Sequence, residues 1–220
     1  MNEEIVRAVE AEKIIVIVRG IKSDKLVELA EAMYRGGIRL LEITYSADGS
    51  TSDEETAQNI KMLSEHFFGR MYIGAGTVLT EKQVELTQAA GGRFIISPDT
   101  DPEVIKRTKA LGLISMPGAL TPTEIQLAHK SGADFVILFP ITKMGVDYVK
   151  ALKAPLSNIR LLAVGGINVN NIADYLKAGV CGFGIGSNIV SKKLVDLNDF
   201  EAITESARKY TQAVRQCPII

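Results

Sequence analysis

Residues 161–187 of the chain read LLAVGGINVNNIADYLKAGVCGFGIGS. The apolar run Leu161–Val164 is followed by Gly165-Gly166, then by a segment with helical spacing of its apolar residues, and then by a second apolar run, Gly182–Ile185. Two parallel strands need a long connection between them, which is usually a helix. The stretch therefore predicts one strand–helix–strand unit with a glycine-rich turn after each strand.

The same unit recurs along the chain. Short apolar runs appear at near-regular intervals, and a segment with helical periodicity follows each of them. The runs are continuous in Val, Ile, Leu and Phe rather than alternating, which is typical of strands covered on both faces. A closed parallel barrel needs eight strands, and the eight runs are Ile14–Val18, Leu40–Thr44, Met71–Ala75, Phe94–Ser97, Leu113–Met116, Phe135–Phe139, Leu161–Val164 and Gly182–Ile185.

The main alternative is an open, doubly wound α/β sheet. That fold follows its first strand with a Gly-x-Gly-x-x-Gly turn, whereas this chain reads Val18-Arg19-Gly20-Ile21 at that point. We therefore predict a single α/β domain over residues 1–220, folded as a (β/α)8 TIM barrel. We expect an extra N-terminal helix at residues 2–12 to cover the bottom of the barrel, and residues 198–215 to form the last outer helix.

Composition argues against several classes of protein. The 220 residues are 46% hydrophobic and 23% charged, which is the balance of a globular chain and not of a disordered one. A net charge of −1 without a basic block argues against a nucleic-acid partner. Cys181 and Cys217 fit no metal-ligand spacing, and we expect neither a metal nor a cofactor. The N-terminus is acidic, and no apolar run approaches the roughly 20 residues of a membrane span, so we expect a cytoplasmic protein with no membrane partner.

In this fold the chemistry usually lies at the carboxyl ends of the strands, where Glu42 is the most informative residue. It stands between Leu41 and Ile43, late in a buried strand, where an unpaired carboxylate is costly. Burial raises the pKa of a glutamate toward the range useful for general acid–base catalysis. The alternative is a structural ion pair with Arg19 on the neighbouring strand.

Glycine-rich turns follow the last two predicted strands, at Gly165-Gly166 and at Gly186-Ser187. These loops are the usual phosphate site of the fold, because glycines allow backbone N–H groups to approach the phosphate oxygens. The Ser187 hydroxyl adds a further donor. We predict an anion site here, and the alternative is that the glycines only turn the chain. Thr77, after the third strand, is a weaker candidate for a ligand contact.

Taken in order, these motifs resemble those of the 2-keto-3-deoxy-6-phosphogluconate (KDPG) / 4-hydroxy-2-oxoglutarate (KHG) aldolase family. The resemblance runs nearly from end to end, with family-like spacing. The motifs that carry it are Val18-Arg19, Leu41-Glu42-Ile43-Thr44, Gly74-Ala75-Gly76-Thr77-Val78, Ile96-Ser97-Pro98, Pro117-Gly118 with Thr121-Pro122-Thr123-Glu124, Phe139-Pro140, Gly165-Gly166 and Gly186-Ser187.

The resemblance implies a class I aldolase that cleaves a 2-keto-3-deoxy sugar acid, or 4-hydroxy-2-oxoglutarate, to pyruvate and an aldehyde. In that family a lysine on the sixth strand forms a Schiff base with the substrate, and no cofactor takes part. It also implies a homotrimer that acts on a small 2-oxo acid or sugar-acid phosphate. The implied site comprises Arg19 and Glu42, with Glu42 moving protons, substrate contacts at Thr44, Thr77, Pro117 and Gly118, and phosphate contacts at Gly165, Gly166, Gly186 and Ser187.

The chain departs from the family at the Schiff-base position itself. The family lysine lies three residues before the proline of the Phe-Pro motif, and here that residue is Ile137, which has no nucleophilic atom. Three other positions differ as well. Ser46 replaces an arginine found in some members, Asp99 replaces a glycine, and Val164 replaces a threonine. Four changes around one pocket indicate altered function.

Three hypotheses follow from these departures. The first is an aldolase with a relocated lysine, for which Lys22 and Lys143 are the candidates. The second is a catalytically inactive or repurposed protein that keeps the anion loops and Glu42 but forms no imine. The third is a different reaction on the same barrel, such as enolisation or isomerisation with Glu42 as the base.

Overall fold

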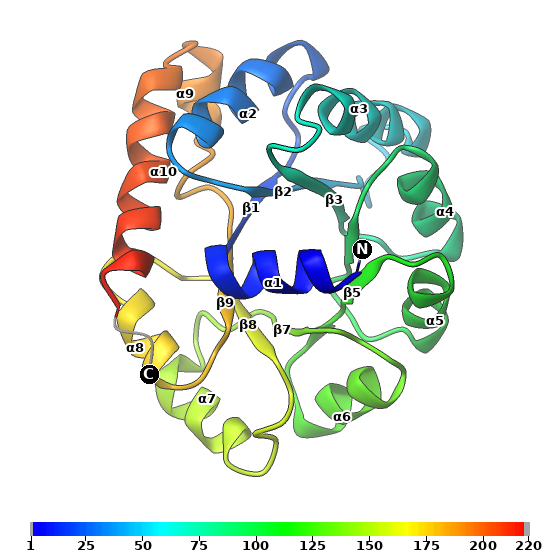
Figure 1. Ribbon diagram of the computed structural model, residues 1–220, viewed down its shortest axis with the longest axis vertical. Coiled ribbons are helices and arrows are strands. Elements are labelled where there is room, and N and C mark those ends of the chain that lie inside the picture. The colour runs from blue at the N-terminus through cyan, green and yellow to red at the C-terminus, as the bar shows by residue number, and fades with distance from the viewer. Residues whose placement is uncertain (1, 218–220) are drawn as a thin grey trace.

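The computed structural model describes residues 2–217, which form a nearly closed barrel of parallel strands surrounded by helices (Figure 1). The strand order is β5-β4-β3-β2-β1-β9-β8-β7-β6, and all paired neighbours are parallel. The strands are β1 Ile14–Val18, β2 Leu40–Thr44, β3 Tyr72–Gly76, β4 Phe94–Ile96, β5 Ile114–Met116, β6 Gly118–Ala119, β7 Val136–Leu138, β8 Leu161–Val164 and β9 Gly182–Ile185.

Strands β5 and β6 are two halves of one strand that is interrupted at Pro117. β5 pairs with β4, and β6 pairs with β7. Proline has no N–H to donate to a ladder, but its carbonyl still accepts. The N–H of Ile137 donates to the carbonyl oxygen of Pro117 at 2.8 Å. The barrel therefore closes through the fifth strand, and the predicted (β/α)8 fold is confirmed.

Helices follow the strands and form the outer layer of the barrel (Figure 1). None of the helices within residues 2–217 is long and apolar enough to span a membrane. The helices are α1 Asn2–Glu12, a 3-10 turn at Ser23–Lys25, α2 Leu26–Arg35, α3 Asp53–His66, α4 Glu81–Ala89, α5 Pro102–Ala110, α6 Pro122–Lys130, α7 Gly145–Lys153, α8 Ile172–Lys177, α9 Lys192–Asp196 and α10 Phe200–Arg215.

Side-chain caps explain where several of these helices begin. The Thr80 hydroxyl accepts from the N–H of Gln83 at the start of α4. At α6, Thr121 and Glu124 form a reciprocal capping box, which satisfies two backbone donors that a helix start leaves open. The last outer helix, expected at residues 198–215, begins at Phe200 because the Asp199 side chain caps it.

Helix α1 lies across one end of the barrel (Figure 1). Its Ile5 and Val9 side chains belong to the same buried cluster as Ile15 of β1 and Phe94 of β4. The helix therefore closes the bottom of the barrel with apolar side chains, as the sequence predicted. Ile5 is only 2% exposed, so it contributes the full hydrophobic gain of a buried aliphatic side chain.

Alternation along the strands places the site in the layer above this cluster. Successive side chains of a strand point to opposite faces. Leu40 belongs to the buried cluster inside the barrel, so Glu42 and Thr44 also face the interior, nearer the carboxyl end of β2. A side chain at Gly74 would overlap the ring of Phe94. The absence of a Cβ there lets Phe94 fill the middle of the barrel below Glu42.

We expect Ile5→Ala to lower the free energy of unfolding by about 2–4 kcal/mol, because the truncation leaves a cavity between α1 and the barrel floor. Urea unfolding followed by circular dichroism measures the loss. Arg7→Ala is the control on the same helix, because the Arg7 side chain is exposed and, among the described residues, pairs only with the exposed Glu3. The control change is expected within about 0.5 kcal/mol. Equal losses for the two variants would mean that α1 does not seal the barrel.

Candidate active site

A cavity of about 60 Å³ opens at the carboxyl ends of the strands. Most of its wall is apolar, and Glu42, Arg19, Thr77 and Ser97 supply the polar side chains. Active sites of this fold lie at this end of the barrel, built from strand ends and the loops that follow. The complete lining is Ile15, Ile17, Arg19, Glu42, Thr77, Ile96, Ser97, Pro98, Ile137, Phe139, Leu162, Val164 and Gly184.

Glu42 is the buried acid of this cavity. Its side chain is 3% exposed, and its Oε2 atom has no hydrogen-bond partner among the described residues. Burial raises the pKa of Glu42 to about 8, against a smaller opposing effect of the Arg19 charge. The carboxyl group is therefore largely protonated at neutral pH, and it then has an O–H to donate. A side chain at Gly76 would overlap the Glu42 carboxyl, so glycine is required beside it.

The ion pair between Glu42 and Arg19 that we considered as an alternative does not form within the described structure. Arg19 instead donates from Nη2 to the Thr77 hydroxyl at 3.0 Å. Thr77 has a φ of +54°, a left-handed conformation that is uncommon for a residue other than glycine. The bond holds two of the predicted site residues together at the mouth and leaves Glu42 without a counter-ion.

Thr44 lies two residues beyond Glu42 on β2 and therefore on the same face of the strand. It is buried, and its Oγ1 atom also lacks a partner among the described residues. Buried polar atoms normally find hydrogen-bond partners, and each exception requires an explanation. Of the two unpartnered atoms on β2, Glu42 Oε2 belongs to a residue that lines the cavity, and Glu42 is therefore the group that a polar ligand can reach.

Ile137 occupies the cavity wall on the far side of the barrel from β2. It lies on β7, is 3% exposed, and pairs in register with Gly118 and Leu162. Its side chain lines the same cavity as Glu42. Lys22 and Lys143 are both exposed, and neither lines the cavity. Among the described lining residues, Arg19 is the one cation.

The two glycine-rich loops lie side by side after β8 and β9. Gly165 and Gly166 have φ values of +103° and +71°, which favour glycine strongly. The Asn171 side chain donates to the Gly166 carbonyl at 3.0 Å, and Asn188, next to Ser187, donates to the Ile167 carbonyl at 2.8 Å.

These hydrogen bonds occupy loop carbonyl groups, whereas the backbone N–H groups of the two turns are not used. Within residues 2–217, no protein acceptor is bonded to the N–H groups of Gly165, Gly166, Gly186 and Ser187. Ser187 is exposed. Free N–H groups on adjacent turns are the arrangement that anion sites use.

The other predicted substrate residues lie outside the cavity lining. Pro117 accepts the β7 hydrogen bond described above, and the Gly118 carbonyl accepts from the Thr100 hydroxyl at 2.7 Å. A side chain at Gly118 would overlap the backbone of Pro98. In this structure both residues therefore hold neighbouring strands together at the mouth, and of the four predicted substrate contacts only Thr77 lines the cavity.

The three further departures lie around the same mouth. Ser46 bonds to Asp48 and Ser50 in the loop after β2. Asp99 is exposed after β4, and partial burial of its carboxyl raises its pKa. Val164 contributes an apolar wall to the cavity. Residues 2–217 contain no group of three or more His, Cys, Asp or Glu side chains arranged to hold a metal ion.

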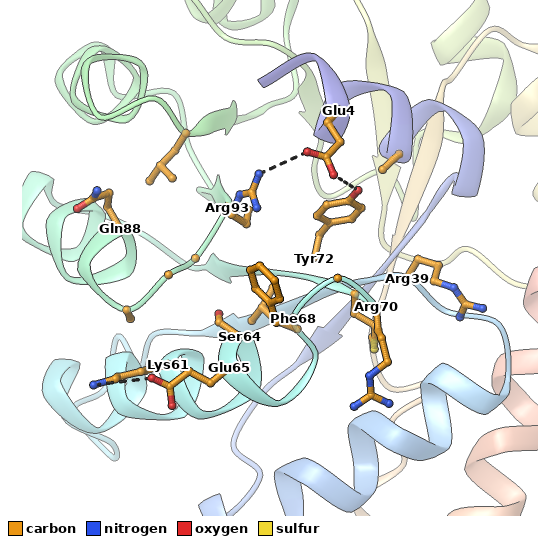
Figure 2. A pocket seen from close by; sticks show the side chains of 18 of the residues that line it. Glu4, Arg39, Lys61, Ser64, Glu65, Phe68, Arg70, Tyr72, Gln88 and Arg93 are labelled. Atoms are coloured by element: carbon orange, nitrogen blue, oxygen red, sulfur yellow. Dashed lines mark hydrogen bonds and ion pairs between the residues drawn. The ribbon is translucent and has the colours of Figure 1, made fainter. Parts of the chain in front are cut away.

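A larger groove of about 970 Å³ lies at the opposite end of the barrel (Figure 2). Helix α1 and the loops before β3, β4 and β5 form it. Figure 2 shows Glu4 between Arg93 and Tyr72, at 3.8 Å and 2.7 Å respectively. Each of the four cations in its lining already faces a protein acceptor, namely Arg39 with two carbonyls, Lys61 with Glu65, Arg70 with Glu31, and Arg93 with Glu4. Ser64 Oγ in the groove lining also lacks a partner among the described residues, but the mouth combines an unpartnered buried carboxyl with free backbone N–H groups and is the better candidate site.

A parallel (β/α)8 barrel with a buried acid and free N–H groups at its mouth belongs to a class of barrels whose members are predominantly enzymes. The KDPG and KHG aldolase family model matches residues 5–206. The chain belongs to this family.

Several individual relatives agree with this assignment. The probable 2-dehydro-3-deoxy-6-phosphogalactonate aldolase of Rhizobium meliloti is 36% identical over 80% of this chain and 81% of its own. A solved structure described as native KDPGal superposes with a TM-score of 0.83 at 32% identity, covering 93% of this chain and 95% of that one. The KDPG aldolase of Legionella pneumophila, solved with pyruvate captured as a covalent carbinolamine, gives a TM-score of 0.82 at 28% identity, covering 92% and 96%.

The pH dependence of stability tests the state of Glu42. Its pKa is about 8 in the folded chain against 4.5 ordinarily, so between these values the folded state binds a proton that the unfolded state has lost. Stability relative to Glu42→Gln is then greatest below pH 4.5, falls by about 1.4 kcal/mol per pH unit as the pH rises, and levels off above pH 8. Urea unfolding of both proteins at pH 5, 6, 7 and 8 measures the difference. Parallel curves would show that Glu42 ionises normally.

Proposed function

We propose that this member of the family binds a small 2-oxo acid or sugar-acid phosphate at the barrel mouth without forming an imine on β7. The observation that carries the proposal is the position of Ile137. Its side chain lines the cavity that contains Glu42, and no lysine lies in the described lining. The cavity at the barrel mouth can therefore bind a ligand, but it lacks the lysine that would form an imine with it.

The missing amine decides the chemistry. Imine formation requires a lysine nitrogen that attacks the 2-oxo carbon, and the resulting iminium accepts the electrons released when the carbon–carbon bond breaks. The carbinolamine captured with pyruvate in the Legionella relative is the covalent adduct that gives such an imine when it loses water. An isoleucine side chain forms no such bond. Aldol cleavage by that route is therefore not expected of this chain.

The remaining groups support non-covalent recognition. A protonated Glu42 carboxyl, whose Oε2 atom has no partner among the described residues, donates a hydrogen bond to the 2-oxo oxygen. The free N–H groups after β8 and β9, with Ser187, bind the phosphate end. Apolar walls at Ile137 and Val164 enclose the carbon chain between the two ends.

The aldolase with a relocated lysine has weaker support. A nucleophilic lysine must be desolvated so that it is neutral at working pH. Lys22 and Lys143 are both exposed. The homotrimeric assembly expected from the resemblance and the cytoplasmic location expected from the sequence stay predictions.

Calorimetry with 2-keto-3-deoxy-6-phosphogluconate tests the proposal. We expect saturable binding, weakened about tenfold in Ser187→Ala because a hydrogen bond to a charged phosphate is lost. Borohydride added with pyruvate should leave the mass of the protein unchanged. A borohydride-trapped adduct would establish the relocated-lysine aldolase instead, and an absence of any affinity would contradict the anion site.

Replacing Ile137 with lysine tests whether the rest of the site is intact. At this buried position the ammonium form is disfavoured, which lowers the pKa of the new amine and makes it nucleophilic. We expect Ile137→Lys to give a borohydride-trapped pyruvate adduct and measurable release of pyruvate from KDPG. Val164→Lys, on the neighbouring strand, is the matched control and should give neither. A folded Ile137→Lys protein with no adduct would show that the 2-oxo group does not bind beside β7.

A further inference from the structure

The loop between β7 and α7 contains a residue that contacts the glycine pair after β8. Thr142 lies so close to it that a Cβ added at Gly165 would be 2.8 Å from Thr142 Oγ1, and one added at Gly166 would be 3.1 Å from Thr142 Cγ2. The room that Thr142 occupies therefore exists only because both residues are glycines.

The backbone fixes this loop in place. The N–H of Ile141 donates to the Val164 carbonyl at 3.1 Å, and the Ile141 carbonyl accepts from Met144 at 3.0 Å. The Ile141 side chain is fully buried. Thr142 therefore directly follows Ile141, whose backbone is held at the end of β8, although the Thr142 side chain is itself exposed.

The Thr142 hydroxyl has a free donor. It forms no hydrogen bond with any of residues 2–217, while its oxygen lies against a turn whose N–H groups also bond to no protein acceptor. The position directly before the glycine pair, Val164, has no hydroxyl to offer. Thr142 Oγ1, from the neighbouring loop, therefore places a side-chain donor beside the glycine pair.

We propose that Thr142 is a phosphate-binding residue of the mouth and that it makes the site select phosphorylated ligands over carboxylates. The three donors come from three loops, with Thr142 after β7, the glycine N–H groups after β8 and Ser187 after β9. This proposal rests on the proposed function, since it assigns a further residue to the same anion site.

The selectivity follows from the shape of the two anions. A phosphate monoester presents three acceptor oxygens arranged around phosphorus, and it carries up to two negative charges. A carboxylate presents two oxygens in one plane. The donors of the loops after β8 and β9 are enough for the two oxygens of a carboxylate. A donor from a third loop, after β7, finds an acceptor only when the ligand is a phosphate with a third oxygen.

The test compares Thr142→Val, which removes the hydroxyl at nearly constant shape, with Thr142→Ser, which keeps it. The ligands for calorimetry are 2-keto-3-deoxy-6-phosphogluconate and the unphosphorylated acid 4-hydroxy-2-oxoglutarate, which has a carboxylate at the end away from its 2-oxo acid group. We expect Thr142→Val to weaken binding of the phosphorylated ligand about tenfold, which is a usual size for one hydrogen bond to a charged group. Thr142→Ser should bind within about twofold of the wild type.

Two further proteins complete the experiment. Thr123→Val makes the same chemical change at an exposed position of α6 and should leave both affinities unchanged, as should Thr142→Val for the unphosphorylated acid. Normal affinity of Thr142→Val for the phosphorylated ligand, with Ser187→Ala weakened, would overturn the role of Thr142 and leave the proposed function standing. If the wild type binds neither ligand, the proposed function fails and the role of Thr142 fails with it.

Discussion

Closure of the barrel through the interrupted fifth strand is the constraint on which the rest of the molecule depends. Pro117 breaks the strand but still accepts the N–H of Ile137, so β4 and β7 are joined into one ring. A closed ring has an interior, and alternation along each strand then assigns every second side chain to it. Glu42 from one side and Ile137 from the other line one cavity for this reason, although 95 positions separate them in the sequence.

The periodic features of this fold could be predicted from sequence, because each depends on local pattern. The eight apolar runs become strands close to where the pattern places them, and the N-terminal helix forms at residues 2–12 as predicted. The break at Pro117 was not predicted, because the sequence alone does not reveal whether a proline after a strand ends it or interrupts it. Sequence patterns describe segments, whereas barrel closure depends on which segments meet.

The candidate site shows the same division. The sequence placed Glu42 at the mouth and predicted burial, which the structure bears out. The ion pair with Arg19 was an open alternative, and it does not form because Arg19 donates to Thr77. Sequence reasoning passed over Thr142, whose only signal was a hydroxyl shortly after the end of a strand. Its contact with Gly165 spans 23 positions and depends on two loops that meet only in the folded barrel.

The apolar character of the mouth explains the state of Glu42. A cation close to a carboxyl favours its ionised form and lowers its pKa. The described lining of the cavity contains one cation, Arg19, which is already bonded to Thr77. Glu42 therefore stays protonated up to about pH 8. Near neutral pH Glu42 is protonated in most molecules and can donate a hydrogen bond. It then lacks the negative charge that a proton-abstracting base needs. The apolar wall at Ile137 thus leaves the Glu42 acid opposite it better suited to donating a hydrogen bond to a carbonyl oxygen than to removing a proton from carbon.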